Sequence, residues 1–415
     1  MKKLLISFAL LISLVSGAFA ENIFSHRFFE IKLDVDASVS NNLVTLQDFC
    51  KPDLVIDLPK IADSMGNNGF MSNVFIASGL SINLDIPNGI ILGVNIGIEE
   101  SSNLGLSKDI FDFIGHGNAG KSELKQSLSN TYLDLFATAS VTGGWNLQNM
   151  KVSATGTSFW SLAHLTAGDS YIKVYNTEDG KFGAEIHSDA SIYSTIDFNK
   201  DINDYNKIIK NTLNNGGFDI TANVDYDLFR YLTLGATTRI PLVPSKLPMS
   251  AGINFKESYE VDLMDLLTEE DKPDPENGGG KKNDDLLTDA VILSKPYAVH
   301  RPFKLGASVD FHPNGTLLST YGYLGLGVRH PFAKQKSETQ AYIDYTVGGK
   351  LSLWNMFTID LCHSYNDEVF KNQITAAFNL RLVEADLGVS YQSPSFTKCF
   401  SASGFGAFAS VSIGF

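Results

Sequence analysis

The last eighteen residues, Lys398 to Phe415, constrain the fold more than any other stretch. From Phe405 onward every second position is apolar, and four of the positions between them are glycine or serine. This period of two predicts a β-strand. The strand ends on the ring of Phe415, beside which a free carboxylate and a frayed backbone would lie. Such an ending is unusual for a soluble protein.

This ending resembles the C-terminal signature of bacterial outer-membrane β-barrels, in which the last strand is recognised by the assembly machinery. The resemblance implies that Phe415 contacts that machinery. Because a barrel must pair its first and last strands, the closing strand is expected to lie beside the amphipathic stretch His26 to Asn41.

The first twenty residues read as a cleaved signal peptide. Lys2 and Lys3 precede an apolar core from Leu4 to Val15, and Ala18-Phe19-Ala20 forms a cleavage site. The apolar core is shorter than the about 20 residues that a spanning helix needs. We therefore expect cleavage after Ala20 and a mature chain of residues 21–415 that forms one domain.

After the signal, no run of eighteen apolar residues occurs, which excludes spanning helices. The exported chain is then either a soluble protein or a β-barrel. The strands of a barrel alternate apolar and polar residues, so their average hydropathy does not reveal that they span a membrane. Aromatic residues at 11%, 35 glycines and a mean hydropathy near zero suit the barrel better. A formal charge of −14 argues against nucleic acid, which needs clustered lysine and arginine.

Alternation recurs along the mature chain. Gly79 to Ile86 and Ile90 to Ile98 alternate on either side of a Pro-Asn-Gly turn, which predicts a hairpin. Phe218 to Leu228 sets apolar residues against five polar ones, three of them acidic, which require water or a polar interior. About fifteen to seventeen such stretches occur. We predict an all-β, transmembrane antiparallel barrel of about 14 strands, with 16 as the alternative.

Three segments interrupt this pattern, and loops of this length are functional or disordered. Residues 42–72 surround two prolines. Residues 101–130 suggest two short helices around a glycine-rich bend, and we take this segment as the candidate plug or helical insert. Residues 260–300 are expected to form an acidic extracellular loop, because their first part, 260–289, contains eleven acidic residues and only three lysines.

No motif supports catalysis, a cofactor or a metal. Gly115 to Ser122 matches the phosphate-binding loop pattern, but that loop needs a buried strand before it and a βαβ context. His363 and Ser364 are strand neighbours that point to opposite faces, so they cannot act as base and nucleophile together. The acidic loop lacks a fixed cation-ligand spacing. Cys50, Cys362 and Cys399 form no disulfide framework, although one incidental disulfide remains open.

Three short motifs resemble a family of FadL-like outer-membrane proteins. They are His26 to Ile31 in the first strand, the Gly115 to Gly120 loop, and the Ile240 to Pro244 strand end. The resemblance implies a plugged fourteen-stranded barrel that moves long-chain fatty acids or other hydrophobic molecules across the outer membrane without catalysis. Family plugs precede the first strand, whereas here only Glu21 to Ser25 do so.

The plug and the ligand site are therefore expected within residues 101–130, whose apolar side chains have no evident sheet partner. The predicted ligand-binding residues are Leu104, Leu106, Ile110, Phe111, Phe113 and Ile114. Two other functions stay open at this point. A diffusion porin would use the acidic lumen, and a structural protein or adhesin would use the barrel only to display its loops.

Overall fold

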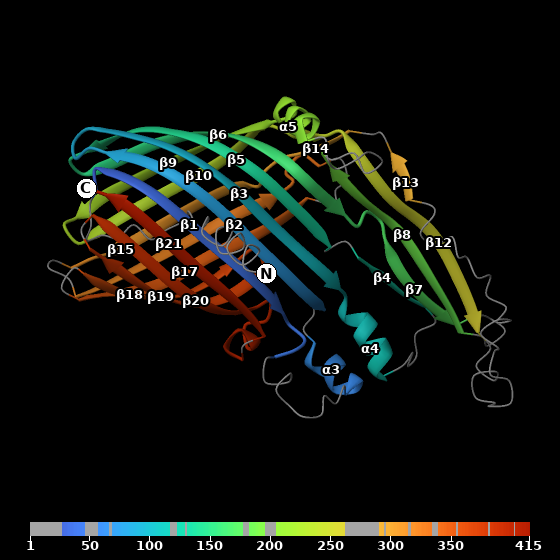
Figure 1. Ribbon diagram of the computed structural model, residues 1–415. Coiled ribbons are helices and arrows are strands. Elements are labelled where there is room, and N and C mark those ends of the chain that lie inside the picture. Colours follow the sequence, from blue (N-terminus) through green and yellow to red (C-terminus); the bar gives the residue numbers. More distant parts are fainter. Residues whose placement is uncertain are drawn as a thin grey trace, which may run out of the picture.

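A computed structural model shows a closed antiparallel β-barrel (Figure 1). It describes residues 27–45, 57–65, 69–116, 123–128, 131–176, 182–195, 205–261, 290–293, 296–313, 317–333, 339–353, 356–380, 382–401 and 403–415. The predicted signal peptide and most of the acidic loop, residues 262–289, lie outside these ranges.

Fourteen strands form the ring, as predicted. Each pairs antiparallel with the next, and β21 pairs with β1 to close the barrel, Val35 lying opposite Ala409. In ring order they are β1 (Phe29–Asn41), β2 (Phe70–Asp85), β3 (Ile90–Leu106), β5 (Tyr132–Leu147), β6 (Met150–Thr166), β9 (Gly217–Phe229), β10 (Leu232–Val243), β15 (Phe303–Phe311), β16 (Leu318–Arg329), β17 (Gln340–Leu353), β18 (Phe357–Asn366), β19 (Val369–Asn379), β20 (Val383–Ser393) and β21 (Gly404–Gly414).

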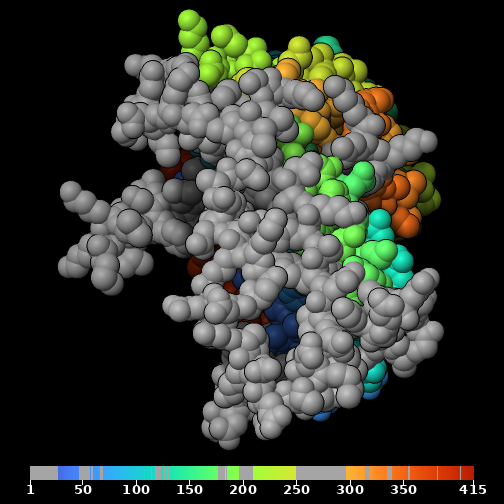
Figure 2. Space-filling model, turned by 90° about the vertical axis from the view of Figure 1, so that its right-hand side faces the viewer, coloured from blue at the N-terminus to red at the C-terminus, as the bar shows by residue number. Residues whose placement is uncertain are grey.

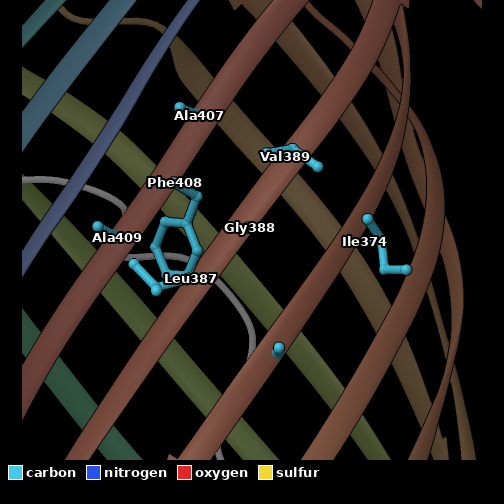
Figure 3. Close-up of a pocket in the computed structure, with 8 residues that line it drawn as sticks. Ile374, Leu387, Gly388, Val389, Ala407, Phe408 and Ala409 are labelled. Carbon is cyan, nitrogen blue, oxygen red and sulfur yellow. The ribbon is translucent and has the colours of Figure 1, made fainter.

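The outer surface of the ring is apolar. In β3 every second side chain from Ile90 to Ile98 is exposed, and in β9 exposed Ile220 and Val224 alternate with the inward Asp219, which is fully buried. A depression lined by residues of β19, β20 and β21 has a volume of about 480 Å³ and an apolar lining that includes Leu387, Val389 and Phe408 (Figure 3). This alternation is that of a barrel in lipid with a polar interior.

Aromatic side chains ring the outer surface near both ends. At the end that holds the C-terminus, Phe28 packs edge-on against Phe415, with ring centroids 4.7 Å apart. At the other end, the rings of Phe370, Phe396 and Phe400 surround His363. Aromatic girdles at both membrane interfaces are typical of such barrels.

The two ends of the barrel differ in how the strands are joined. The end that holds the C-terminus has short turns, such as the Pro-Asn-Gly turn between β2 and β3, where Asn88 adopts φ +53°. The other end carries the long connections and the helices α3 (Leu58–Ser64), α4 (Lys108–His116) and α5 (Tyr205–Asn214). In Figure 2, which faces this end, α5 (lime) lies at the top and α4 (cyan) towards the bottom. We call these the short-turn end and the long-connection end.

An extension of the same sheet, which we call the side sheet, projects from the long-connection end of the wall (Figure 1). It contains β4 (Glu123–Ser127), β7 (Tyr171–Asn176), β8 (Phe182–Ser194), β12 (Met249–Val261) and β13 (Ala290–Leu293). Among the about fifteen to seventeen alternating stretches of the sequence, residues 171–175, 182–198 and 249–259 were expected in the wall. They contribute β7, β8 and β12 to the side sheet instead, which explains why more strand patterns occur than the ring uses.

β6 belongs to both the wall and the side sheet. It pairs with β9 as far as Phe159, and from Ala163 it pairs with β8 instead. A β-bulge lies at this change of partner. On β5 the neighbours Leu135 and Phe136 pair with Ala163 and Ser161 of β6, so Leu162 has no residue opposite it. A bulge bends its strand and shifts which side chains face inward. The side sheet therefore branches from the wall at one inserted residue.

The connection between β10 and β15 enters the barrel interior. Its strands β11 (Ser245–Leu247) and β14 (Tyr297–Val299) form a two-stranded antiparallel ladder, which we call the inner ladder. β10 continues through Pro241 to Val243, three residues past Ile240, where the strand was predicted to end. The inner ladder contributes to a buried cluster with wall residues of β5 and β6.

Within the described residues, no helix has both the length and the apolar character to cross a membrane. Cys362 and Cys399 are free thiols, and Cys50 lies outside the described residues.

Candidate functional site

The inner ladder fills part of the lumen with apolar side chains. Leu247 and Val299 pack with Phe136 of β5 and Phe159 of β6, and all four are buried. Phe159 fits because Gly217 on β9 lacks a side chain. A Cβ atom there would lie 2.3 Å from the Phe159 ring. The polar interior of the barrel thus contains an apolar core where the ladder meets the wall.

Ser245 holds the ladder against the branch point of β6. Between Phe159 and Ala163 β6 pairs with neither β9 nor β8, so its backbone groups need other partners. The amide of Ser161 donates to Oγ of Ser245 at 2.9 Å, and that hydroxyl donates to the carbonyl of Asn215 at 2.9 Å. The gap that the branch leaves in the sheet is therefore closed by the ladder.

Arg301, two residues after β14, fixes the other side of the ladder. Its Nη1 donates to Oδ2 of Asp219 on β9 at 2.8 Å, and its Nη2 lies 2.9 Å from both carboxylate oxygens of Glu99 on β3. The guanidinium carbon also lies 6.0 Å from the ring centroid of Phe159. A planar guanidinium suits two carboxylates at once. The ladder is thus clamped to two strands of the wall.

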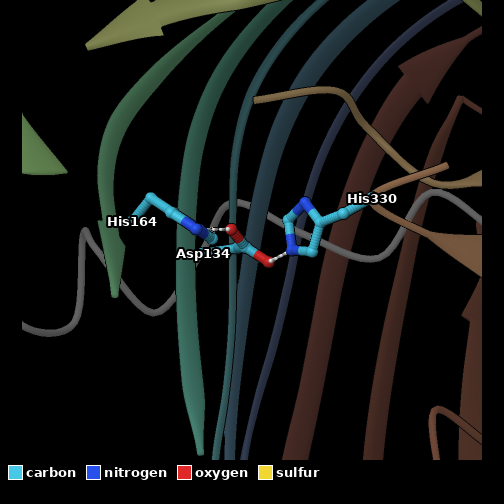
Figure 4. Close-up of side chains that lie close together, drawn as sticks. All are labelled: Asp134, His164 and His330. Atoms are coloured by element: carbon cyan, nitrogen blue, oxygen red, sulfur yellow. Dashed lines mark hydrogen bonds and ion pairs between the residues drawn. The ribbon is translucent and has the colours of Figure 1, made fainter. Parts of the chain in front are cut away.

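Three further side chains meet beside the ladder (Figure 4). Asp134 of β5 lies between two imidazoles: its Oδ1 is 2.8 Å from Nδ1 of His164, and its Oδ2 is 3.1 Å from Nε2 of His330. All three are buried. The His164 ring stacks on Tyr297 of β14 at 4.9 Å, and Tyr297 stacks on Tyr193 of β8 at 4.3 Å. This group joins the wall, the ladder and the side sheet.

Backbone irregularities aim both histidines at Asp134. Phe159 and Ser161 face inward before the bulge, and the extra residue Leu162 moves the inward set to His164 and Thr166. His330 follows β16 and adopts φ +44°, a region that residues other than glycine rarely occupy.

His300 directly follows β14 and belongs, like the inner ladder, to the β10–β15 connection. Its ring packs edge-on against Phe332, with centroids 5.0 Å apart. Burial lowers the pKa of His300 below its usual range, and neighbouring His330 lowers it further. The imidazole is therefore held towards its neutral form.

A second set of contacts crosses the mouth of the barrel. Asp367, in the turn between β18 and β19, accepts hydrogen bonds from Ser101 of β3 at 2.8 Å and from Tyr132 of β5 at 3.2 Å. Arg329 pairs with the same carboxylate and stacks over the Tyr132 ring at 4.0 Å. β5 and β18 are half the ring apart, so these contacts bridge opposite walls. The lumen is therefore crossed by side chains at its long-connection end.

The remaining lumen charges are largely matched between strands. Lys304 pairs with Asp344 at 3.2 Å, and Lys371 pairs with Asp36 at 2.8 Å. Tyr321 donates to Asp360 at 2.9 Å. The acidic face predicted from the alternation thus lines the interior, where basic and hydroxyl groups neutralise much of it.

The predicted ligand-binding residues occupy the rim at the long-connection end. Leu104 and Leu106 belong to wall strand β3, whereas Ile110, Phe111, Phe113 and Ile114 belong to α4, which packs on α3 and β4. Phe111 lies 6.2 Å from the Phe70 ring, and Phe70 pairs with Leu106. The side chain of Ile114 lies outside the described residues. The structure thus places Leu106 and Phe111 next to the same residue, Phe70; their role in binding stays a prediction.

The residues that meet inside the barrel were not predicted as a site, because they lie far apart along the chain. Asp134, His164 and His330 have no metal-like or catalytic spacing, and Arg301 lies 202 residues from its partner Glu99. One signal was available: the alternation of β5 places Asp134 on the inward face with Phe136. The phosphate-loop match is not supported, since helix α4 rather than a strand precedes it; its residues 117–122 lie outside the described ranges.

Neither protein-family models nor curated protein sequences gave a match. Among solved structures, the chain is similar to the Ralstonia pickettii toluene transporter TbuX, with 8% identity, a TM-score of 0.47, and coverage of 94% of this chain and 90% of that one. The Pseudomonas putida toluene transporter TodX has 9% identity and a TM-score of 0.45, with coverage of 94% of this chain and 91% of that one. A Pseudomonas aeruginosa FadL homologue has 10% identity and a TM-score of 0.42, with coverage of 92% of this chain and 89% of that one. The description of the fold rests on the strand pairing given above.

Proposed function

We propose that this chain is a FadL-like outer-membrane protein that moves hydrophobic small molecules across the membrane without catalysis, and that the inner ladder controls the passage. The observation that carries the proposal is the apolar core inside an otherwise polar lumen, in which Leu247 and Val299 of the ladder cover Phe136 and Phe159 of the wall. Displacing the ladder would expose an apolar surface within the barrel. An apolar ligand gains about 0.8 kcal/mol for each methylene that it buries on such a surface.

The membrane location follows from the outer surface. An apolar band with aromatic girdles at both ends suits a bilayer, and short turns at one end with long connections at the other suit an outer-membrane barrel whose long loops face outward. Phe415, whose carbonyl accepts hydrogen bonds from the amides of Phe28 and Phe29 at 3.0 and 3.1 Å, marks the seam that we expect the assembly machinery to recognise.

The plug in this proposal differs from the one expected in residues 101–130. Those residues form the end of β3, the helix α4 and the strand β4. The interior position is taken by residues 245–247 and 297–301 of the β10–β15 connection. We assign the plug role to this segment and leave α4 and the adjoining end of β3 as a capture site at the rim.

The lumen contacts disfavour a diffusion porin. An open water-filled channel needs a continuous path, whereas here Arg301 and the Asp367 contacts cross the lumen at the long-connection end. Liposome swelling tests this directly. The wild-type protein is expected to pass small sugars at rates close to those of protein-free liposomes, while taking up a long-chain fatty acid such as oleate, or toluene. Swelling in sugars at porin-like rates would refute the plugged barrel.

The rim site has its own test. Replacing Phe111 and Phe113 with alanine removes apolar surface from α4 and is expected to weaken oleate binding about tenfold, the effect of losing about 1.4 kcal/mol. The matched control replaces Ile209 and Leu213, exposed apolar residues of α5 at the same end, and is expected to bind as wild type does. Equal weakening in both variants, or in neither, would remove α4 from the proposal.

A further inference from the structure

We propose that Asp134, His164 and His330 form a binding site for one divalent transition-metal ion of the Zn²⁺ type. The three residues come from β5, β6 and the connection after β16, and no more than 6% of any of them is exposed. One ligand atom from each lies within 4.8 Å of the other two. Among the described residues, this is the group of acidic, histidine and cysteine side chains that could hold an ion.

The donor set decides the class of ion. Two imidazole nitrogens and one carboxylate oxygen suit Zn²⁺, Co²⁺, Ni²⁺ or Cu²⁺, whereas Mg²⁺ and Ca²⁺ prefer sites made only of oxygen. Three protein ligands also leave one position of a tetrahedral ion for water or another ligand.

The distances require only small movements. Bonds of about 2.0–2.1 Å in a tetrahedral site place neighbouring donor atoms about 3.3 Å apart. Asp134 already lies 2.8 Å from His164 and 3.1 Å from His330, so the imidazoles need to approach each other around the carboxylate. His330 directly follows the last residue of β16 and lies outside the strand pairing.

The surroundings hold the His164 ring and leave its Nε2 available. The ring is kept in place by stacking on Tyr297 and by the bulge before it. Its Nδ1 contacts Asp134, and its Nε2 is buried without a hydrogen-bond partner among the described residues. An ion can therefore bind Nε2, or bind Nδ1 in place of the contact with Asp134, which is itself one of the three ligands. The left-handed backbone at His330 is a local cost of about 1–3 kcal/mol that an inward-facing ligand would explain.

An ion at this position would tie together parts of the mouth that are distant in the ring. β5 and β6 carry two ligands, and β16, five ring positions from β5, carries the third. Tyr297 of the inner ladder stacks on one ligand. Resting on the proposed function, we further infer that the bound ion holds the ladder in place and slows the passage of hydrophobic molecules.

A metal titration tests the site. The full-length protein in detergent, first dialysed against a chelator, is titrated with Co²⁺ while its visible absorption is followed, and with Zn²⁺ by calorimetry. We expect one ion per chain. His330→Gln and His164→Gln should each weaken binding at least about 100-fold, since loss of even an outer partner costs about 10–100-fold.

The chain offers a matched control. His116 on α4 lies 3.0 Å from Asp63, but this histidine–carboxylate pair is exposed. His116→Gln should bind Co²⁺ as the wild-type protein does. Equal weakening in His116→Gln and His330→Gln, or no binding of one ion per wild-type chain, would overturn the proposal.

Thermal unfolding keeps the test decisive if a variant folds poorly. An ion that binds only the folded state stabilises it, so Zn²⁺ should raise the unfolding midpoint of the wild-type protein and of His116→Gln. An unchanged wild-type midpoint would contradict the site. Oleate uptake by liposomes with and without Zn²⁺ then tests the coupling alone. Absence of uptake under both conditions would count against the proposed function, while the titration would still decide the metal site.

Discussion

The two halves of the ring are built differently. From β15 to β21 the strands form a meander in which each strand follows the previous one after a short connection at either end, and the charges pair between strands of the wall. From β1 to β10 the turns at the short-turn end are equally tight, but the β1–β2, β3–β5 and β6–β9 connections at the other end are long. In this half β6 also branches into the side sheet, and the β10–β15 connection returns into the lumen. Both halves span the barrel wall and present an apolar outer face. The irregular half provides the interior contacts that distinguish this barrel from an open pore.

The comparison predicts that removing the Arg301 ion pairs inside the barrel lowers the free energy of unfolding more than removing an ion pair between strands of the regular half. Arg301→Ala leaves Asp219 buried without its partner, which should cost about 3–5 kcal/mol. Lys304→Ala, which breaks the pair with Asp344 between two strands of the regular half and removes a lysine whose side chain is 36% exposed, should cost about 1 kcal/mol. Denaturant unfolding in lipid vesicles measures both. Arg301→Ala should also raise sugar permeability in liposome swelling. Equal costs would mean that the halves do not differ in this respect.

Two matched Phe→Leu substitutions, one inside the barrel and one on its outer surface, test the comparison with smaller expected changes in the free energy of unfolding. Phe159→Leu leaves a small cavity in the interior cluster and should cost about 1–2 kcal/mol. Phe378→Leu on β19 lies on the outer surface, 48% exposed, where lipid chains fill the space. It should cost well under about 1 kcal/mol, since no rigid cavity remains. The same vesicle unfolding assay applies, and a larger cost for Phe378→Leu would reverse the assignment of the core.

The smallest expected effect concerns pH. The folded pKa of His300 is lowered, mainly by burial and also by His330. Its contribution to stability is therefore intact above the ordinary histidine pKa of about 6.5 and is lost as the pH falls below it, because the unfolded chain takes up the proton first. His300→Gln should flatten the fall in unfolding midpoint between neutral and mildly acidic pH. An unchanged slope would place the pH dependence elsewhere.

Much of the barrel could be read from the sequence because its determinants are local. The period-two alternation of β3, β9 and β21 specifies inward and outward faces residue by residue, and the fourteen-strand ring and its closing seam were predicted from it. The side sheet was not, because β7, β8 and β12 carry the same local pattern as wall strands. Only the bulge at Leu162 reassigns them, and one extra residue leaves little trace in a hydropathy pattern.

The interior could not be predicted for a different reason. Arg301 meets Glu99 and Asp219, and His330 meets Asp134, only after the ring has closed and the β10–β15 connection has folded inward. Such contacts depend on tertiary placement rather than on spacing along the chain. The apolar residues of α4 were noticed because they stand out locally, whereas the residues that cross the lumen are individually ordinary.

The bulge at Leu162 links two features of the interior. If the pairing of β6 with β5 had no extra residue, the inward face of β6 would keep one parity throughout and His164 would point outward. The extra residue turns His164 and Thr166 inward close to where β6 exchanges β9 for β8, and Ser245 fills the gap at that exchange. The exchange of partner and the change of inward face thus depend on one short segment of β6, and no strand of the regular half takes part in either.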